Sequence, residues 1–195
     1  MVLLGANTAA LLLNTVYFYN GKLFGVRAGE HRLIHMSNIV VEGNKIVFDE
    51  FRGKTCKGGL KDLKNKPRYI EHICQENRQS HRPCLASMYS LYVEKIESHA
   101  ESIISFYFPP HRSEKFEYEK RPVGLCALNK ILPEKLLGKA GLARKTAHCL
   151  CVICATLLLQ NSVEEKLARG RKNRTQVQCT FRLSKGLWQT GPKCN

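Results

Sequence analysis

Proline and acidic residues are scarce in this sequence and glycine is no more frequent than usual, and these observations exclude several classes of protein. The 195 residues include 14 glycines and 7 prolines, and no segment of about 20–50 residues repeats, which excludes collagen-like and repeat architectures. Only 16 acidic residues oppose 31 lysines and arginines, giving a formal net charge of +15. The positive electrostatic field of such a chain favours polyanionic partners, either nucleic acid or an anionic membrane. Apolar residues make up 44% of the chain, enough for a packed core, so wholesale disorder is also excluded.

The first 21 residues carry no charged side chain, and Lys22 is the first one. A signal peptide needs basic residues followed by one unbroken apolar run. Here nothing basic precedes the run, and four residues interrupt it, namely Gly5, Asn7, Thr8 and Asn14. The segment is also too polar for a membrane span of about 20 apolar residues. We therefore predict a buried helix over about residues 8–24, ending at Gly25, in a protein that is neither exported nor membrane-bound.

Nine cysteines, in a chain expected to occupy a reducing compartment, indicate free thiols rather than a disulfide framework. Cys151 and Cys154 have the CxxC spacing of zinc sites and redox motifs, but no second pair follows at zinc-finger spacing. The run over residues 149–155 is apolar, and cysteine serves as a small hydrophobic residue in such a helix. We expect a core role and no metal, with a zinc or redox site as the alternative.

The patterns along the chain predict an α+β domain, mostly helical, with one small antiparallel sheet near the N-terminal third. Two β-branched runs flank Gly43 within residues 38–48, which indicates a β-hairpin. Residues 103–108 are expected to run extended. Further helices are expected near Ala28 and over residues 85–96, 124–137 and 146–160. Helices outnumber strands, which argues against a doubly wound fold, and neither a Rossmann, P-loop nor HExxH motif occurs.

Three basic motifs follow one another in an informative order. Residues 24–32 place Arg27 between two glycines at a corner between helices. Residues 53–59 form a glycine-rich, basic turn after the hairpin and contain Lys54 and Lys57. Residues 145–151 place His148 at the start of an apolar helix.

This order resembles the catalytic domain of tyrosine recombinases of the phage integrase type. Those enzymes have an arginine in a glycine-flanked box, a lysine on a β-hairpin, an HxxR motif at a helix start, a Gly-His box and a tyrosine nucleophile. A closer resemblance is to the Crypton-derived recombinase-like domain of unknown function, found at the C-terminus of zinc-finger MYM-type and glutamine-rich nuclear proteins. It covers about residues 3–183, and four stretches carry it: residues 14–20, 30–33, 54–59 and 139–142.

The resemblance assigns vestigial catalytic positions to three residues. Arg27 matches the first arginine, Lys54 (less well Lys57) the hairpin lysine, and His148 the motif histidine. In the enzymes, two arginines stabilise the charge of a pentavalent phosphorane, while lysine and histidine manage protons. Each residue also has a purely structural interpretation: an arginine that satisfies carbonyls at a helix corner, a solvated turn lysine, and a histidine with a structural bond.

The remaining positions of the pattern are degenerate. The second arginine falls on Cys151, the Gly-His box falls on Gly170 and Arg171, and the nucleophile should lie near Thr180 and Phe181. No tyrosine follows residue 118, so the covalent step has no nucleophile at the expected place. The resemblance therefore implies a domain that is not an enzyme.

We expect an inactive, transposon-derived, nuclear domain that binds DNA or chromatin, with no cofactor and no small-molecule substrate. The recombinase-like domain is placed at residues 1–183, without the N-terminal clamp domain of the family, and residues 184–195 form a basic tail. The expected phosphate contacts are Arg27, Lys54, Lys57, Arg144, Lys145, Arg169, Arg171, Lys172 and Arg174. The alternatives are a protein-interaction scaffold in a nuclear complex and, less favoured, a strand-transfer enzyme whose tyrosine is displaced or supplied in trans.

Overall fold

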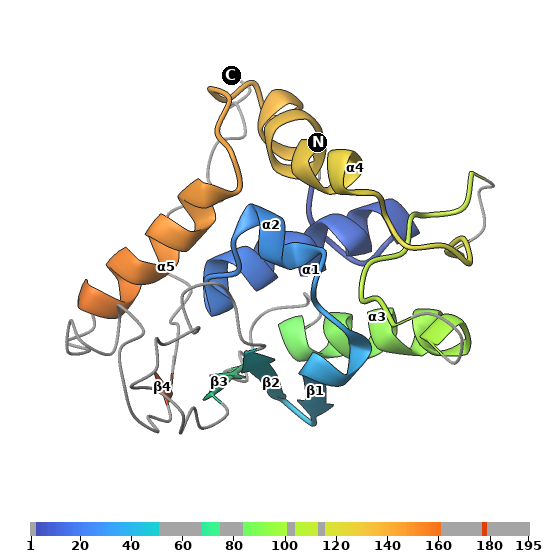
Figure 1. Ribbon diagram of the computed structural model, residues 1–195, viewed down its shortest axis with the longest axis horizontal. Helices are drawn as coiled ribbons and strands as arrows, with labels where there is room; N and C mark the ends of the chain where they lie inside the picture. The colour runs from blue at the N-terminus through green and yellow to red at the C-terminus, as the bar shows by residue number, and fades with distance from the viewer. Residues whose placement is uncertain are drawn as a thin grey trace, which may run out of the picture.

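The computed structural model describes residues 3–50, 68–74, 84–100, 104–112, 116–160 and 177–178. In the described part of the chain, a small sheet lies at one edge and the helices lie above and beside it, so the predicted α+β class is confirmed (Figure 1). The helical elements are α1 (Ala9–Phe24), α2 (Ala28–His31), η1 (Met36–Asn38), α3 (Leu85–Ala100), α4 (Leu125–Lys130), the π-helical η3 (Ile131–Gly138) and α5 (His148–Gln160). The strands are β1 (Ile39–Glu42), β2 (Lys45–Glu50), β3 (Arg68–Ile73) and β4 (Val177–Gln178).

Helix α1 begins and ends where its sequence predicts. The Thr8 hydroxyl accepts a hydrogen bond from the Leu11 backbone N–H at 3.2 Å, and Gly25 ends the helix in the left-handed region at φ 66°. The helix packs against α3, α5 and η3, so it is buried around most of its circumference rather than along one face. This explains why its sequence carries almost no charge.

The predicted hairpin is confirmed, with Gly43 at φ 59° in the turn between β1 and β2. Strand β3 pairs antiparallel with β2, and β4 extends the sheet by a two-residue parallel pairing with β3. The buried ring of Phe48 on β2 stacks on Phe24 at the end of α1, with ring centroids 5.0 Å apart. The sheet is thereby fixed against the C-terminal end of α1.

Residues 103–108 were predicted to be strand-like or extended, but the described residues 104–108 form no strand and the chain bends at Phe106. The Tyr92 hydroxyl on α3 donates to the Phe106 carbonyl at 2.9 Å and accepts from the Phe108 backbone N–H at 3.2 Å. A side chain thus takes the place of a neighbouring strand. Phe106, Tyr107 and Phe108 are all buried, which makes this segment part of the core.

The helical stretch predicted over residues 124–137 is present but changes geometry in its middle. Helix α4 continues into η3, whose wider π-type turns contain Pro133. Proline has no backbone N–H to give to an α-helical turn, and a π-helical segment accommodates that loss. Among the helices described, none has both the length and the apolar character that crossing a membrane requires.

Candidate nucleic-acid interface

Helix α5 lies beside the C-terminal half of α1, and a glycine permits the close approach (Figure 1). A Cβ atom added at Gly21 would lie only 2.7 Å from Cδ1 of the buried Leu150. Only glycine therefore fits at this point of α1 while α5 holds its position.

Two thiols of α5 bind the backbone at the end of α1. The Cys151 Sγ donates to the Val26 carbonyl at 3.2 Å, and the Cys154 Sγ donates to the Leu23 carbonyl at 3.5 Å. Burial raises the pKa of the Cys151 thiol to about 11, so this thiol is protonated near neutral pH. The CxxC spacing thus places one thiol per helical turn against the end of α1. The predicted buried helix is only half buried, because Val152 and Ile153 on its other face are exposed. The side chains described include no group of three metal-ligating residues close enough to hold an ion.

The contact between Cys151 and Val26 brings Arg27 to the side of α5. Arg27 caps α2, where its backbone N–H donates to the Glu30 carboxylate at 3.0 Å, and its guanidinium lies 3.9 Å from the same carboxylate. The Arg27 side chain is 53% exposed. The negative charge of Glu30 raises the pKa of the Cys151 thiol, and the positive charge of Arg27 lowers it. Both charged groups therefore lie within electrostatic range of Cys151. Arg27 therefore presents its charge to solvent next to α5.

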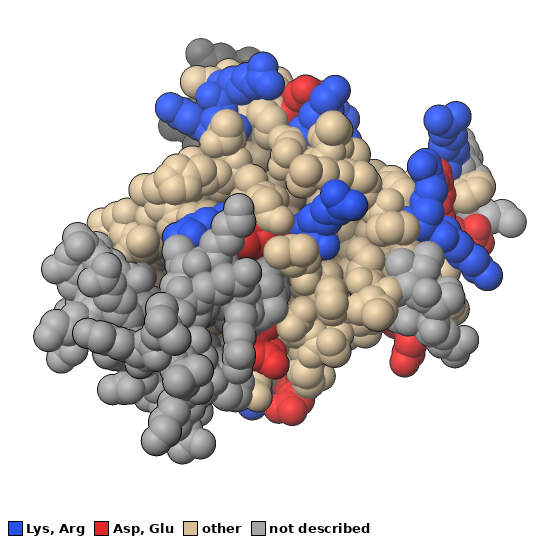
Figure 2. All heavy atoms as spheres, in the orientation of Figure 1, with Lys and Arg blue, Asp and Glu red and all other residues tan. Residues whose placement is uncertain are grey.

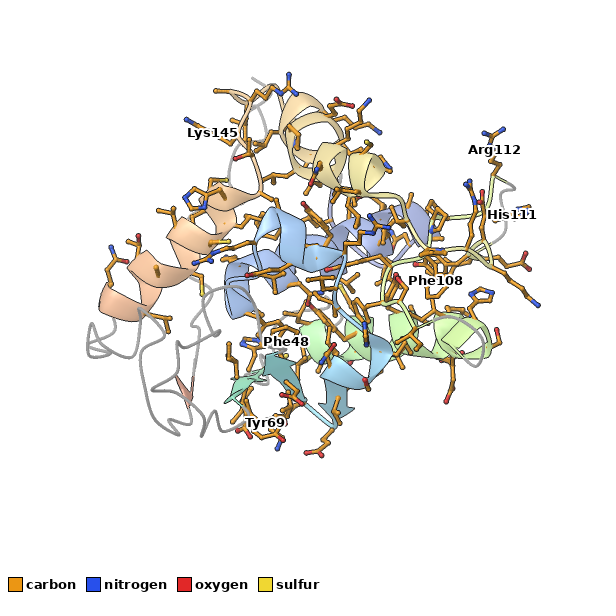
Figure 3. The ribbon with its side chains drawn as sticks, in the orientation of Figure 1. Phe48, Tyr69, Phe108, His111, Arg112 and Lys145 are labelled. Atoms are coloured by element: carbon orange, nitrogen blue, oxygen red, sulfur yellow. The ribbon has the colours of Figure 1, made fainter. Side chains whose placement is uncertain are left out.

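The segment that leads into α5 adds further positive charge. Residues 138–146 are all exposed, and Arg144 and Lys145 stand shortly before the exposed His148 that begins α5. Figure 3 shows Lys145 on this segment, projecting outward near the N-terminal end of α5. No acidic residue occurs between Lys135 and Gln160. Figure 2 shows lysine and arginine side chains at the upper edge of the molecule, with acidic side chains also visible among them.

We call Arg27, Arg144, Lys145 and His148 the basic surface. These four residues come from segments more than 110 positions apart in the sequence. The hydrogen bond from Cys151 to Val26 places the first turn of α5, which begins at His148, beside the residue that precedes Arg27, and Arg144 and Lys145 lie shortly before that turn. Cys151, the degenerate arginine position, lies one helical turn from His148 and against the backbone that precedes Arg27. The other predicted site residues lie outside the described residues: Lys54, Lys57, Arg169, Arg171, Lys172, Arg174, Thr180 and Phe181.

Sequence reasoning did not single out Tyr17, the tyrosine that the structure places beneath this surface. Burial, followed by the nearby thiols Cys151 and Cys149, raises the pKa of Tyr17 to about 12. Its ring stacks on the buried His31 with centroids 4.2 Å apart, and neither side chain is exposed to solvent. The Tyr17 hydroxyl is therefore protonated and sealed from any ligand on the basic surface. The only signal in the sequence was a set of polar and tyrosine residues within an apolar helix.

A buried hydrogen-bond network continues from His31 into the core. The Asn20 amide Nδ2 donates to the Tyr107 hydroxyl at 2.7 Å, and the Tyr89 hydroxyl donates to Asn20 Oδ1 at 2.6 Å. The Tyr107 hydroxyl also forms a hydrogen bond of 2.7 Å with His31 Nδ1. Burial lowers the pKa of His31 to about 3, so its ring is neutral near neutral pH. The network fixes α2, and with it Arg27, to α1.

Comparison with known proteins gives one positive finding. The family model described as a domain of unknown function, DUF3504, matches residues 1–137, which include α1 through most of η3 and the Arg27 motif. The motif around His148 lies beyond the matched residues. No curated protein matches the chain.

Proposed function

The chain belongs to the family of the domain of unknown function DUF3504, and from this premise we propose that it is a catalytically inactive, recombinase-like domain that binds DNA in the nucleus. Its basic surface contacts the phosphodiester backbone. The domain binds DNA without cleaving it, and the residues that match the recombinase pattern bind phosphate groups only.

The hydrogen bond from Cys151 to the Val26 carbonyl carries this proposal. In the recombinase pattern, the glycine-flanked arginine and the histidine motif at a helix start serve one phosphate. That arrangement requires two segments far apart in the sequence to meet. Here the Cys151 thiol joins them, so Arg27 and the start of α5 share one neighbourhood.

The chemistry of the basic surface suits a phosphate ligand. Arg27 offers a partly exposed guanidinium, which binds phosphate oxygens in a bidentate manner. Arg144 and Lys145 add two exposed cations in the segment that leads into α5. Such contacts supply affinity without sequence specificity.

Two features make the same surface unsuitable for strand cleavage. A thiol at position 151, engaged with a carbonyl, cannot supply the second pair of charge-assisted hydrogen bonds that the phosphorane requires. The nearest described tyrosine is Tyr17, whose buried hydroxyl has a raised pKa and cannot reach a phosphate at the surface. Incubation with a nicked suicide DNA substrate should therefore yield no covalent protein–DNA adduct, and an adduct would establish an active enzyme instead.

A salt series tests the binding itself. The full chain is titrated with a fluorescent DNA duplex between about 50 and 300 mM salt, where affinity should fall steeply and linearly on a log–log plot. Affinity that does not change with salt concentration would exclude the phosphate-contact proposal.

A different surface favours the alternative, a protein-interaction scaffold. An open cavity of about 260 Å³ is lined by Arg32 together with Ile104, Ser105, Tyr107, Pro122, Val123, Gly124 and Leu128. Ile104 is 74% exposed at its edge, and the neighbouring Leu33 is also exposed. Exposed apolar side chains around a cavity suit a protein partner. If DNA binding is absent and the substitution Ile104→Asp abolishes capture of a nuclear protein, this alternative replaces the first proposal.

A further inference from the structure

A pair of thiols lies where the sheet meets α3, away from the basic surface. Cys74 directly follows β3, and Cys84 directly precedes α3. Asn44, in the hairpin turn, forms two hydrogen bonds with the backbone of Cys74. The Asn44 carbonyl accepts from the Cys74 backbone N–H at 2.8 Å, and the Asn44 amide donates to the Cys74 carbonyl at 3.2 Å. Cys74 is therefore anchored at a fixed position in the fold.

The Cys74 side chain is also held, at the first turn of α3. Its Sγ accepts a hydrogen bond from the Ala86 backbone N–H at 3.3 Å. Ala86 is two residues from Cys84, and the Cys84 carbonyl accepts from the Met88 N–H at 3.1 Å, so Cys84 belongs to the same helical turn. The Cys84 thiol lies close enough to raise the pKa of the Cys74 thiol. Cys74 is buried and Cys84 is half-exposed.

From this geometry we propose that Cys74 and Cys84 form a reversible redox pair, which glutathione disulfide oxidises to an intramolecular disulfide. The pair is independent of the DNA-binding proposal, because it uses none of the residues of the basic surface. Disulfides of this kind in a reducing compartment are transient and serve redox sensing.

The reaction takes place in two exchange steps. The Cys84 thiolate, more accessible than Cys74, attacks one sulfur of glutathione disulfide, breaks its S–S bond and releases one glutathione thiolate. The Cys74 thiol then loses its proton to solvent and attacks the Cys84 sulfur, which expels the second glutathione. Two protein thiols are oxidised and one glutathione disulfide is reduced to two glutathiones.

The difference in burial between the two cysteines determines which thiol attacks glutathione disulfide first. Burial raises the pKa of the Cys74 thiol to about 11, and the nearby Cys84 thiol adds to this shift. Cys74 is therefore mostly protonated and shielded from the external disulfide, and it reacts once the sulfur of Cys84 has been activated next to it. Cys84 is the attacking residue and Cys74 the resolving one.

Peptide mapping of the full chain tests the pair directly. The protein is equilibrated with glutathione disulfide, alkylated, denatured and digested with trypsin. Cleavage after Arg68, Arg78 and Lys95 places Cys74 in the peptide 69–78 and Cys84 in the peptide 79–95, with one cysteine in each. We expect these two peptides to be joined by a disulfide and to separate on reduction.

Two variants complete the design. Cys74→Ser removes the resolving thiol, so Cys84 should retain glutathione as a stable mixed disulfide. Cys126→Ser removes an exposed thiol on α4 and should leave the cross-link at the wild-type level. The proposal is overturned if wild-type Cys84 accumulates the glutathione adduct, if either cysteine pairs elsewhere, or if both stay free while Cys126 is fully glutathionylated.

Discussion

The thiol of Cys151 donates a hydrogen bond to the backbone carbonyl of Val26 across 3.2 Å, and this contact joins α5 to the residue that precedes Arg27. In the proposed recombinase-like arrangement, the position of Cys151 corresponds to an arginine. The hydrogen bond holds the segment of Arg27 beside α5, and the thiol contributes no positive charge there.

Restoring that charge should strengthen DNA binding without restoring catalysis. Cys151→Arg adds a guanidinium beside Arg27, so one more phosphate contact should steepen the slope of log affinity against log salt by about 0.9. The measurement is a fluorescence salt titration, with Cys151→Ala as the control for loss of the thiol. An unchanged slope in the folded variant would mean that no phosphate lies at this position.

The Gly21 position should resist even the smallest side chain. Gly21→Ala places a Cβ 2.7 Å from Leu150, and overpacking of this kind costs about 1–3 kcal/mol of unfolding free energy. Gly29→Ala is the matched control, because a Cβ there meets nothing within 4 Å. Alanine in helix α2 should instead stabilise by up to about 1 kcal/mol. Urea denaturation measures both, and a stabilised Gly21→Ala variant would contradict the described contact of α1 with α5.

Local signals in the sequence were enough to predict most of the helices and the hairpin. Thr8 and Gly25 define the ends of α1 through capping and a left-handed conformation, and Gly43 defines the hairpin turn. These features depend on residues close together in the sequence. The α+β class follows from the same local patterns.

The features that were not predicted depend on distant partners. Tyr92, on α3, hydrogen-bonds to the backbone of Phe106 and Phe108. The buried His31 hydrogen-bonds to Tyr107, 76 positions away. For the site, sequence order identified Arg27 and His148, but only the packing of α5 on α1 shows that their segments meet. A single sequence gives no information on which distant side chains share a buried network.

Removing the Tyr107 hydroxyl should destabilise the fold substantially. Tyr107→Phe leaves both the Asn20 amide and His31 Nδ1 buried without this partner, and each unsatisfied group costs about 1–3 kcal/mol. Tyr69→Phe, at a half-exposed position on β3, should change the unfolding free energy by less than about 0.5 kcal/mol. Chemical denaturation compares the two, and equal effects would show that the network does not stabilise the protein.

The buried His31 should make stability depend on pH. Its pKa is about 3 in the folded protein and about 6.5 when unfolded, so between these values only the unfolded state binds the proton. Stability is therefore present above about pH 6.5 and is lost as pH falls, by about 2 kcal/mol between pH 7 and pH 5. Burial and the nearby Lys120 lower the pKa of His99 too, which acts in the same direction.

A variant isolates the contribution of His31. His31→Asn removes the titrating ring, so the loss of unfolding free energy between pH 7 and pH 5 should be smaller by about 2 kcal/mol. His35→Asn, at an exposed position, should leave the wild-type loss of unfolding free energy. Unfolding free energies at pH 5, 6 and 7 decide the question. A wild-type slope in His31→Asn would show that the ring is protonated in the folded state.

The most direct test of the account is the salt dependence of DNA binding when the basic surface loses charge. In Arg144→Gln/Lys145→Gln, each lost phosphate contact should make the log–log slope shallower by about 0.9, with affinity falling on the order of 10-fold or more. Lys95→Gln on α3 removes a comparable exposed charge away from α5 and should keep the wild-type slope. If the double variant also keeps the wild-type slope and affinity, DNA does not bind where α5 begins, and the central claim is wrong.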